Sequence, residues 1–369
     1  MNVDKKKVAI ATYHKSWNYG ACLQAYASLR VFENIGFDAV LVNYVNADER
    51  PKTAVDHLMS GNVKNAVSAA IKNTLFGCRR NAMKAFDSFH RSLRRTPSVS
   101  CAEDLVGLSV DILVAGSDQI WNPEISGGML DPVFLLDTVG SAKKISFASS
   151  AGSHRFTVQE QDELKRSLDG YSAVSVREDF LGDQIEEFTG ARPFKCLDPT
   201  LMLTSEQWSF EEKRPRDVEE GEKYILAFTL KSNDGEGAGF WGCLSKDTGL
   251  PVWRLTNNSY REKGVDRQLL GMTPQEFLWL VHHASFIITD SFHGTAFSIN
   301  YSTPFVTLPS KSGNNARMLD LLACCGLVDR FIDDSVYREM GNCDFGRASE
   351  YLAAKRSECL AWLERVSNE

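Results

Sequence analysis

The chain has 369 residues, of which 43% are hydrophobic and 24% charged, and its formal net charge is −7. This composition is typical of a soluble globular protein, and the length predicts two domains of similar size. The negative charge argues against nucleic acid as the main partner, because nucleic-acid binding depends on basic surfaces. No run of eighteen apolar residues occurs, so no transmembrane segment is expected, whereas peripheral contact with a membrane stays open.

The nine cysteines are scattered, and none belongs to a CxxC pair or to a His/Cys cluster with metal-ligand spacing. Such use of cysteine is typical of a reducing compartment. The N-terminal MNVDKKKVAIATY runs into a strand pattern and not into the apolar core of a signal peptide. We therefore expect a cytoplasmic protein without a metal, and we interpret His14, His282 and His283 as structural or surface residues.

Strands and helices alternate from the N-terminus. A strand at 8–12 leads through a polar turn into a helix at 20–34, and a second strand follows at 38–44. This strand–helix–strand unit is typical of a parallel sheet. Residues 46–97 are rich in Lys, Arg, Ala and Asn and predict helix. The next elements that we expect are strands at 111–115, 144–148 and 173–176 and a helix at 178–189.

A second alternation follows a charged run at 206–222, whose Pro and Gly residues predict a linker. One of its helices should start at Pro274, with Thr273 as the cap. The sequence thus predicts an α/β protein with two Rossmann-like, doubly wound domains. The expected strands are 224–229, 251–255, 286–289 and 304–308, with an amphipathic helix at 349–365, and the domains are 1–205 and 223–348, with the linker at 206–222 and a terminal helix at 349–369.

The most informative polar turn follows the strand at 286–289. Asp290, Ser291, His293, Gly294 and Thr295 lie together at the start of the next helix. Helix N-termini carry unpaired N–H groups that suit phosphate or carboxylate, and a histidine there can donate to the anion or move a proton. The alternative is a plain turn in which Asp290 or Ser291 caps the helix.

The turn at 13–20 has a comparable position after the first strand. Gly20 permits close approach of a ligand to the backbone, and Asn18 can bind a hydroxyl or cap the helix. Aromatic residues among polar ones would suit a sugar. The alternative is a capped turn beside which Trp17 packs.

The turn that begins Gly116-Ser117-Asp118-Gln119 offers backbone donors and three hydrogen-bonding side chains. Trp121 would stack on a pyranose face, and Asn122 would bind its hydroxyls. The alternative is a tight turn with a buried tryptophan.

Two arginines follow further strands. The fork of Arg177 would hold a carboxylate or phosphate at two points, or else it forms an ion pair with Glu178 or another acid. The polar loop at 311–317 contributes Asn315 and Arg317, and Arg317 is otherwise a solvated surface charge.

Taken in order, these blocks resemble the polysaccharide pyruvyl transferase family. The resemblance covers most of the chain between residues 18 and 329, in separated islands. Each segment is modest alone, and six in the same order make the signal specific. The segments are NYGACLQAYAS at 18–28, ILVAGSDQIWN at 112–122, SVRE at 175–178, LDPTLML at 197–203, ITDSFHGTAFSI at 288–299 and NNARMLDLL at 314–322.

The resemblance implies a fold similar to that of the GT-B glycosyltransferases, with an interdomain cleft, a C-terminal helix that crosses back to the first domain, and no metal. It implies that the enolpyruvyl part of phosphoenolpyruvate, a co-substrate and not a cofactor, is transferred to two hydroxyls of a sugar of a surface polysaccharide or its precursor. Whether this acceptor is lipid-linked, nucleotide-linked or polymeric stays open. The product would be a cyclic pyruvate ketal.

The resemblance also implies which residues act. The family's donor-site arginine and histidine correspond to Arg177 and His293, and we expect these two and Asp118 to be catalytic. His293 is the best candidate for the proton donor, with Asp118 and Asp290 as rivals. The donor-binding residues that we expect are Arg177, Ser291, His293, Gly294, Thr295, Asn315 and Arg317, and the acceptor-binding residues are Asn18, Tyr19, Gly20, Gln24, Gly116, Ser117, Asp118, Gln119, Trp121 and Asn122.

Two other functions fit the same residues. A GT-B type glycosyltransferase would bind the diphosphate of a nucleotide sugar with Arg177 and His293. A non-catalytic glycan-binding protein would keep the cleft without turnover, and substitution of either residue would leave its glycan binding unchanged.

Overall fold

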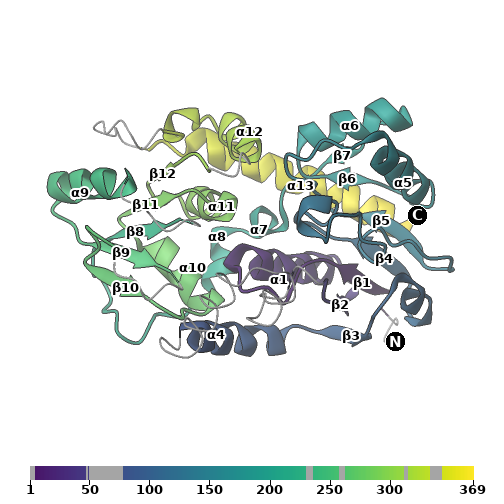
Figure 1. Ribbon diagram of the computed structural model, residues 1–369, viewed down its shortest axis with the longest axis horizontal. Coiled ribbons are helices and arrows are strands. Elements are labelled where there is room, and N and C mark those ends of the chain that lie inside the picture. Colours follow the sequence, from purple (N-terminus) through teal and green to yellow (C-terminus); the bar gives the residue numbers. More distant parts are fainter. Residues whose placement is uncertain are drawn as a thin grey trace, which may run out of the picture. The chain divides into compact units, whose positions relative to one another are not determined.

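The computed structural model describes residues 5–46, 49, 78–229, 236–256, 262–310, 315–332 and 343–369 (Figure 1). The described residues divide into two compact units. The described residues within Met1–Pro51, His90–Leu203 and Ala353–Glu369 form unit 1, and those within Lys52–Phe89 and Thr204–Leu352 form unit 2. Neither unit is therefore a single continuous stretch of sequence.

Unit 1 is built on a five-stranded parallel sheet of order β3-β2-β1-β4-β5. The central strand β4, and β1 after the exposed Lys7, are apolar runs that are buried on both faces, as is usual for central parallel strands. A pair of short strands, β6 and β7, continues beyond β5. The elements are β1 (Lys7–Ala11), α1 (Tyr19–Asn34), β2 (Asp38–Asn43), β3 (Arg95–Ser98), η1 (Ala102–Gly107), β4 (Ile112–Ala115), η2 (Pro123–Ile125), β5 (Lys143–Ser146), α5 (Val158–Leu168), β6 (Ser175–Val176), α6 (Asp179–Thr189), β7 (Phe194–Lys195) and α7 (Pro199–Met202).

Unit 2 repeats this plan with a second five-stranded parallel sheet, of order β10-β9-β8-β11-β12. Helix α4 (Cys78–Ser92) begins in unit 2, and its last residues, from His90, belong to unit 1. The other elements are α8 (Ser205–Ser209), β8 (Ile225–Phe228), α9 (Glu236–Thr248), β9 (Val252–Leu255), β10 (Arg267–Leu269), α10 (Pro274–His283), β11 (Phe286–Thr289), α11 (Phe292–Tyr301), β12 (Phe305–Thr307), α12 (Ala316–Cys325) and η3 (Val328–Arg330).

The two sheets share one strand order: in each, the third, second, first, fourth and fifth strands lie side by side. The chain thus reverses its direction of winding between β1 and β4 in unit 1, and between β8 and β11 in unit 2. Open α/β sheets bind ligands outside the carboxyl ends of their strands at this point of reversal. The turns after these four strands are therefore where a site is expected in each unit.

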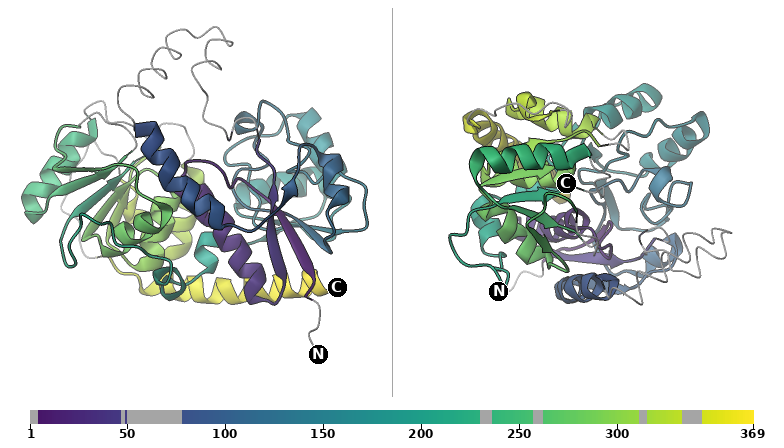
Figure 2. Two further views of the ribbon diagram at one scale, coloured as in Figure 1. Left: turned by 90° about the horizontal axis from the view of Figure 1, so that it is seen from below. Right: turned by 60° about the vertical axis from the view of Figure 1, so that its left-hand side comes forward.

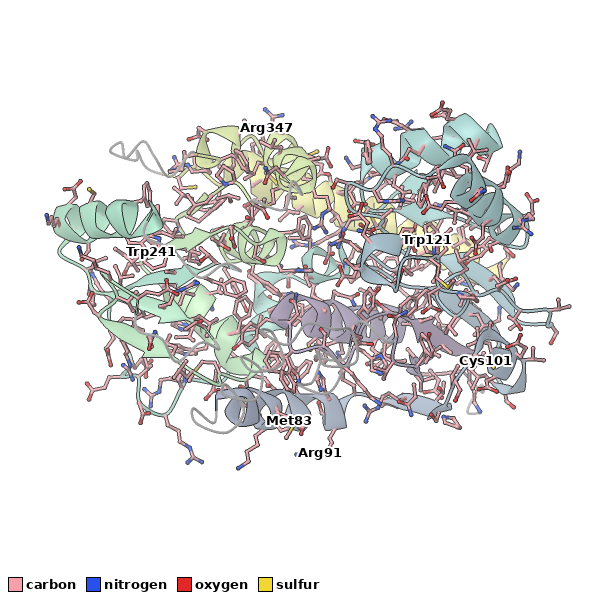
Figure 3. The ribbon with its side chains drawn as sticks, viewed as in Figure 1. Met83, Arg91, Cys101, Trp121, Trp241 and Arg347 are labelled. Atoms are coloured by element: carbon pink, nitrogen blue, oxygen red, sulfur yellow. The ribbon has the colours of Figure 1, made fainter. Side chains whose placement is uncertain are left out.

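Each unit has its own apolar core. Trp121 lies in the core of unit 1 and Trp241 in that of unit 2, and neither side chain is exposed to solvent (Figure 3). The guanidinium carbon of Arg254 lies 5.4 Å from the centre of the Trp241 ring, so a charged side chain also enters the second core.

The last helix, α13 (Gly346–Asn368), is one continuous helix that both units share (Figure 2). Its residues up to Leu352 group with unit 2, and those from Ala353 onward group with unit 1, which confirms the expected C-terminal helix. In unit 1, Trp362 stacks on Phe194 at 5.0 Å between ring centres. No helix in the described ranges is both long enough and apolar enough to cross a membrane.

Most predicted elements occur within a few residues of their expected bounds, and Thr273 caps α10 as predicted. Strand β3 was missed, because residues 46–97 were expected to be helical. It contains Pro97, which an edge strand tolerates. Most of the remainder of 46–97, up to residue 77, lies outside the described residues. The expected linker at 206–222 groups with unit 2, and Trp208 within it is fully buried against Phe297.

Candidate functional site

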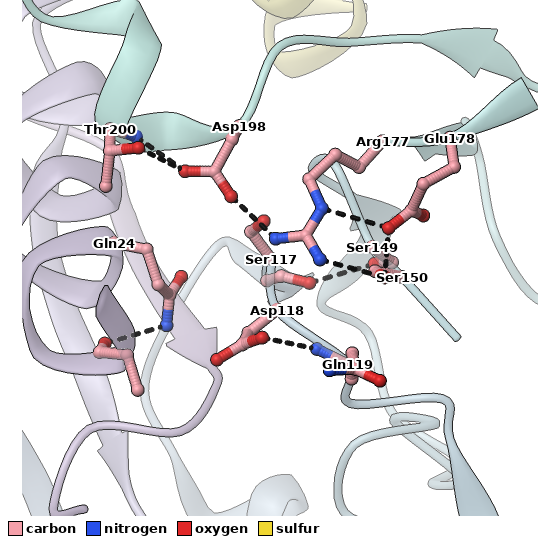
Figure 4. Close-up of polar contacts among 12 residues, drawn as sticks. Gln24, Ser117, Asp118, Gln119, Ser149, Ser150, Arg177, Glu178, Asp198 and Thr200 are labelled. Carbon is pink, nitrogen blue, oxygen red and sulfur yellow. Dashed lines mark hydrogen bonds and ion pairs between the residues drawn. The ribbon is translucent and has the colours of Figure 1, made fainter. Parts of the chain in front are cut away.

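The carboxyl ends of β1 and β4 are joined by buried hydrogen bonds (Figure 4). Thr12 Oγ1 donates to the carbonyl of Ser117 at 2.7 Å and accepts from Gln24 Nε2 at 2.8 Å. Gln24 Nε2 also donates to the carbonyl of Tyr13 at 3.0 Å, which ties α1 to this turn.

Two polar atoms at this point have no hydrogen-bond partner among the described residues: Gln24 Oε1 and Ser117 Oγ, both on side chains with no exposure. An unsatisfied buried polar atom costs about 1–3 kcal/mol. A bound ligand or an ordered water is therefore the expected partner of each atom.

The start of α1 is a capped turn. The side-chain oxygen of Asn18 accepts from the backbone N–H groups of Gly20 at 2.8 Å and of Ala21 at 3.3 Å. Asn18 itself is exposed, whereas Tyr19 is buried. Of the two interpretations given to Asn18, the structure shows the cap, and contact with an acceptor stays a prediction.

Two residues that follow the neighbouring strands β4 and β5 have left-handed backbone conformations that favour glycine. Asp118, after β4, has φ of 68°, and Ala148, after β5, has φ of 52°. Such strain in a non-glycine residue costs about 1–3 kcal/mol and is often found at functional sites. Asp118 Oδ1 accepts from the backbone N–H of Gln119 at 2.9 Å, and its side chain is half-buried and thus open to a ligand.

Arg177 lies at the centre of a buried ion-pair network (Figure 4). Its Nη1 donates to Asp198 Oδ2 at 2.6 Å, its Nε donates to Glu178 Oε1 at 3.1 Å, and its Nη2 donates to Ser150 Oγ at 3.0 Å. The side chains of Arg177, Glu178 and Asp198 are 3%, 5% and 0% exposed. Thr200 completes the set, because its hydroxyl donates to Asp198 Oδ1 at 2.6 Å.

The environment keeps Arg177 charged. Burial opposes the charge, but the carboxylates of Glu178 and Asp198 outweigh it and raise the pKa of Arg177. This is the ion pair that the sequence left as the alternative. The structure thus gives Arg177 a positioning role, in which it joins the ends of β6 and β7 to the segment after β5, and its contact with a donor stays a prediction.

The turn after Asp118 requires one correction. Trp121 was expected to stack on a sugar, but its side chain has no exposure, and its indole N–H donates to the carbonyl of Phe134 at 3.3 Å. Asn122 is also buried, and it caps η2 and donates to Gln119 Oε1 at 2.9 Å. Trp121 is therefore a core residue, and Gln119 is the more accessible member of this group.

The turn after β1 also encloses a carboxylate. The backbone N–H of His14 donates to Glu49 Oε1 at 2.7 Å, and the N–H of Lys15 donates to the same oxygen. Burial raises the pKa of Glu49 to about 7, although these N–H groups favour its charged form. Burial also lowers the pKa of the fully buried His14 to about 4.

Replacing Glu49 with glutamine is expected to make the protein more sensitive to acid. Between about pH 4.5 and 7 folded Glu49 holds a proton that the unfolded chain releases, so acid favours folding there. His14 acts in the opposite direction, because between pH 6.5 and 4 only the unfolded chain binds its proton. Glu49→Gln loses the stabilisation by acid and keeps only the destabilisation by acid that His14 causes. Urea unfolding at two pH values one unit apart, both within the two ranges, measures the free energy of unfolding. At the lower pH, the variant should lose about 1 kcal/mol more of this free energy than wild type loses. Equal losses would contradict the buried carboxylate.

In unit 2 the turn after β11 opens α11. Ser291 is the cap, because its Oγ accepts from the backbone N–H of Gly294 at 3.4 Å. His293 lies in the first turn of the helix and is 8% exposed. Thr295 Oγ1 bonds the Ser291 carbonyl at 3.1 Å and Thr307 Oγ1 at 2.8 Å, so its hydroxyl fixes α11 to the end of β12.

The start of α12 meets this turn. The guanidinium carbon of Arg317 lies 5.5 Å from the centre of the Phe292 ring, which places Arg317 beside the first residue of α11. Asn315 Oδ1 accepts from the backbone N–H of Ser310 at 2.7 Å. Asn315 and Arg317, two of the residues predicted for donor binding, therefore lie at the carboxyl end of the second sheet, and residues 311–314 before them lie outside the described ranges.

A further charged residue at this edge was not predicted. Arg254, in β9, is 1% exposed and donates to the carbonyls of Ala227 at 3.3 Å and Thr229 at 3.0 Å. Burial lowers the pKa of Arg254, while Glu262, whose Oε1 lies 3.4 Å from Arg254 Nε, favours the charged form. An arginine inside the apolar strand sequence VWRL is the signal that could have identified it.

The structure therefore groups the candidate residues into two sets. In unit 1 the set comprises the turns after β1, β4 and β6, joined by Asp198 and by Ser149 and Ser150, to which the sequence assigned no role. In unit 2 it comprises Ser291, His293, Gly294, Thr295, Asn315 and Arg317. That the two sets act on one substrate pair stays a prediction.

Comparisons with known proteins give a family and a fold. A sequence model of the polysaccharide pyruvyl transferase family matches residues 18–312. No curated protein matches the chain. Among solved structures, UDP-N-acetylglucosamine 2-epimerase from Rickettsia bellii is similar, with a TM-score of 0.52 and 10% identity over 98% of this chain and 96% of that chain.

Two further structures are reported for comparison. UDP-GlcNAc 2-epimerase from Methanocaldococcus jannaschii has a TM-score of 0.48 and 12% identity, over 96% of this chain and 92% of that chain. An alpha-glucosyltransferase in complex with UDP and DNA has a TM-score of 0.49 and 11% identity, over 99% and 100%. At such low identities a similar structure shows only the fold. The Rickettsia bellii structure and the two parallel sheets confirm the predicted pair of Rossmann-like domains of GT-B type.

Proposed function

Because this chain belongs to the polysaccharide pyruvyl transferase family, and is thus a transferase, we propose that its donor is phosphoenolpyruvate. The acceptor is a sugar of a surface polysaccharide or of its precursor. Two sugar hydroxyls add to the carbon that carries the phosphate, the methylene carbon takes up a proton, and phosphate leaves. The two hydroxyls release two protons. One of them balances the proton that the methylene carbon takes up, and the other leaves with phosphate. The product is a cyclic ketal.

The observation that carries this proposal is the pair of unsatisfied buried atoms between β1 and β4. Gln24 Oε1 can accept a hydrogen bond from a sugar hydroxyl, and Ser117 Oγ can accept or donate one. The strained, half-buried Asp118 follows directly, where a carboxylate can take the proton of an attacking hydroxyl. This supports an acceptor site in unit 1 with Asp118 as its base.

The donor carries a carboxylate and a phosphate and therefore requires cationic and N–H groups. In unit 2, the N-terminus of α11 supplies backbone N–H groups and partial positive charge, with Arg317 beside it. We assign to His293, on the first turn, the protonation of the methylene carbon of the donor.

Phosphoenolpyruvate is expected to stabilise the protein, whereas UDP- and GDP-sugars are not. At one hundred times its dissociation constant, a ligand that binds only the folded state adds about 2.7 kcal/mol to the free energy of unfolding. Thermal unfolding with each compound, followed by calorimetric titration, measures this. Stabilisation by nucleotide sugars alone would favour the glycosyltransferase function instead.

The two halves of the site can be separated by variants. His293→Gln should bind phosphoenolpyruvate yet lose phosphate release by about 10²–10⁴-fold, because it removes the proton donor. Ser117→Ala should raise the KM for the acceptor and leave donor binding unchanged. His154→Gln serves as the control, since His154 pairs with Glu124 and Glu160 outside both sets. Full phosphate release by His293→Gln would assign the proton to another group.

A further inference from the structure

The carboxyl end of α10 forms a cluster with a residue distant in sequence. His282 and His283 are the last residues of α10, and Glu212 lies in the segment that follows α8. Glu212 Oε1 is 2.8 Å from His282 Nδ1, and Glu212 Oε2 is 3.7 Å from His283 Nδ1. One ligand atom from each of the three residues lies within 4.8 Å of the other two.

The surroundings hold these side chains in place. The His282 ring stacks on Tyr301 at 4.3 Å with an interplanar angle of 12°, and the His283 ring stacks on Trp279 at the same distance and angle. The Glu212 side chain is only 7% exposed, whereas the two imidazoles are 35% and 40% exposed. The carboxylate is thus fixed from the protein side, and the two rings face solvent from which an ion can enter.

The chemistry of the cluster favours a cation. One carboxylate and two imidazoles are the donor set that divalent transition metals bind, whereas calcium and magnesium prefer oxygen ligands. The cluster lies at the carboxyl end of α10, and Tyr301 is the last residue of α11, so the partial negative charge of both helix ends adds to the attraction.

We propose that Glu212, His282 and His283 bind one divalent transition-metal ion, for which zinc is the best match. The ion replaces the proton shared by His282 Nδ1 and Glu212 Oε1, and His283 gives up its 2.9 Å bond to the Trp279 carbonyl or binds through Nε2. Three protein ligands leave the fourth position to water. The ion joins the segment that follows α8 to α10 and stabilises unit 2. This role is independent of the proposed pyruvyl transfer.

Titration of zinc into protein without an affinity tag, after treatment with a chelator, tests the site. We expect one equivalent to bind and to raise the melting temperature. Glu212→Gln and His282→Gln should each weaken zinc binding by more than about 10–100-fold. A loss of about 10–100-fold is typical when a residue that only supports a metal ligand is replaced. His154→Gln is the matched control, because Glu124 and Glu160 bond opposite nitrogens of that ring and cannot close on one ion.

Cobalt separates this site from cysteine sites such as the exposed Cys101 and Cys243. Cobalt at the cluster should give visible d–d bands without the near-ultraviolet charge-transfer band that thiolate ligands produce. Circular dichroism of the metal-free variants checks that they remain folded, and His283→Gln replaces any that does not. Equal zinc affinity in wild type and in the ligand variants, or the absence of one-equivalent binding by wild type, would overturn the proposal.

Discussion

Replacing Arg177 with alanine is expected to lower the free energy of unfolding by about 3–5 kcal/mol, because it leaves two carboxylates buried without a counter-charge. Asp198 and Glu178 are 0% and 5% exposed, and Arg177 is paired with both. Ser150 also loses the guanidinium that its hydroxyl accepts from. Urea unfolding followed by circular dichroism measures the loss.

Arg192→Ala is the matched control for this prediction. Arg192 also contacts carboxylates, those of Asp179, Asp183 and Glu186, but its side chain is 46% exposed. Exposed ion pairs contribute about 0–1 kcal/mol, since water screens them. If the two alanine variants are equally stable, burial does not set the strength of the Arg177 network.

This expectation changes how donor binding should be tested. Loss of phosphoenolpyruvate binding in Arg177→Ala would follow from unfolding as readily as from a lost contact. Arg177→Lys keeps the charge but cannot bridge Asp198, Glu178 and Ser150 with one planar group. A folded Arg177→Lys protein with unchanged donor affinity would confine Arg177 to its positioning role.

The second large effect is expected at Gly294, in the first turn of α11. A Cβ atom there would lie 2.9 Å from Thr289 Cβ and 3.1 Å from Phe228 Cδ1, and closer still to Thr289 Oγ1. Thr289 belongs to β11 and is fully buried, so it cannot move aside freely. We expect Gly294→Ala to cost about 3 kcal/mol, the upper end of what overpacking usually costs.

The same clash affects function through the cap. Thr289 Oγ1 accepts from the backbone N–H of Ser291 at 3.1 Å, and Ser291 caps the helix that carries His293. Displacement of Thr289 therefore shifts His293 as well. Phosphate release by Gly294→Ala should be slower than in wild type even at temperatures at which the variant is folded. Unchanged release would show that the turn does not affect the chemistry.

Gly242→Ala is the control for the glycine prediction. Gly242 is also helical, in α9, but a Cβ atom there meets no atom within 4 Å. Alanine in an open helical position is favoured over glycine by up to about 1 kcal/mol. The two substitutions are chemically identical, so opposite signs in thermal unfolding would isolate the contact with Thr289.

The sequence predicted the fold well because its strands are short apolar runs that end in polar turns. Parallel strands buried on both faces give this signal, and β1, β4, β8 and β11 all show it. β3 lacks it, because an edge strand that contains Pro97 is neither continuous nor apolar. Local pattern thus identifies central strands better than edge strands.

The candidate site was predicted less completely, because pairing between distant residues leaves no local pattern. The turns that hold Ser117, Asp118 and His293 were identified from their composition. That Asp198 pairs with Arg177, and that Glu212 faces His282, depends on chain segments that only the tertiary fold brings together. Whether a polar side chain faces a ligand or a protein partner is decided by these pairings.

The division of α13 between the units has a consequence for synthesis on the ribosome. Unit 1 contains a segment that precedes all of unit 2 in the sequence, yet Leu197 N–H donates to Cys359 Sγ at 3.4 Å, and Arg356 Nε donates to the Leu201 carbonyl at 2.7 Å. These contacts hold the segment that carries Asp198, the partner of Arg177. Because they involve Arg356 and Cys359, most of the chain must be made before these contacts can form. Synthesis proceeds at about 5–20 residues per second. The unit that is translated first is therefore completed last, and until then the carboxylate partner of Arg177 has no support from α13.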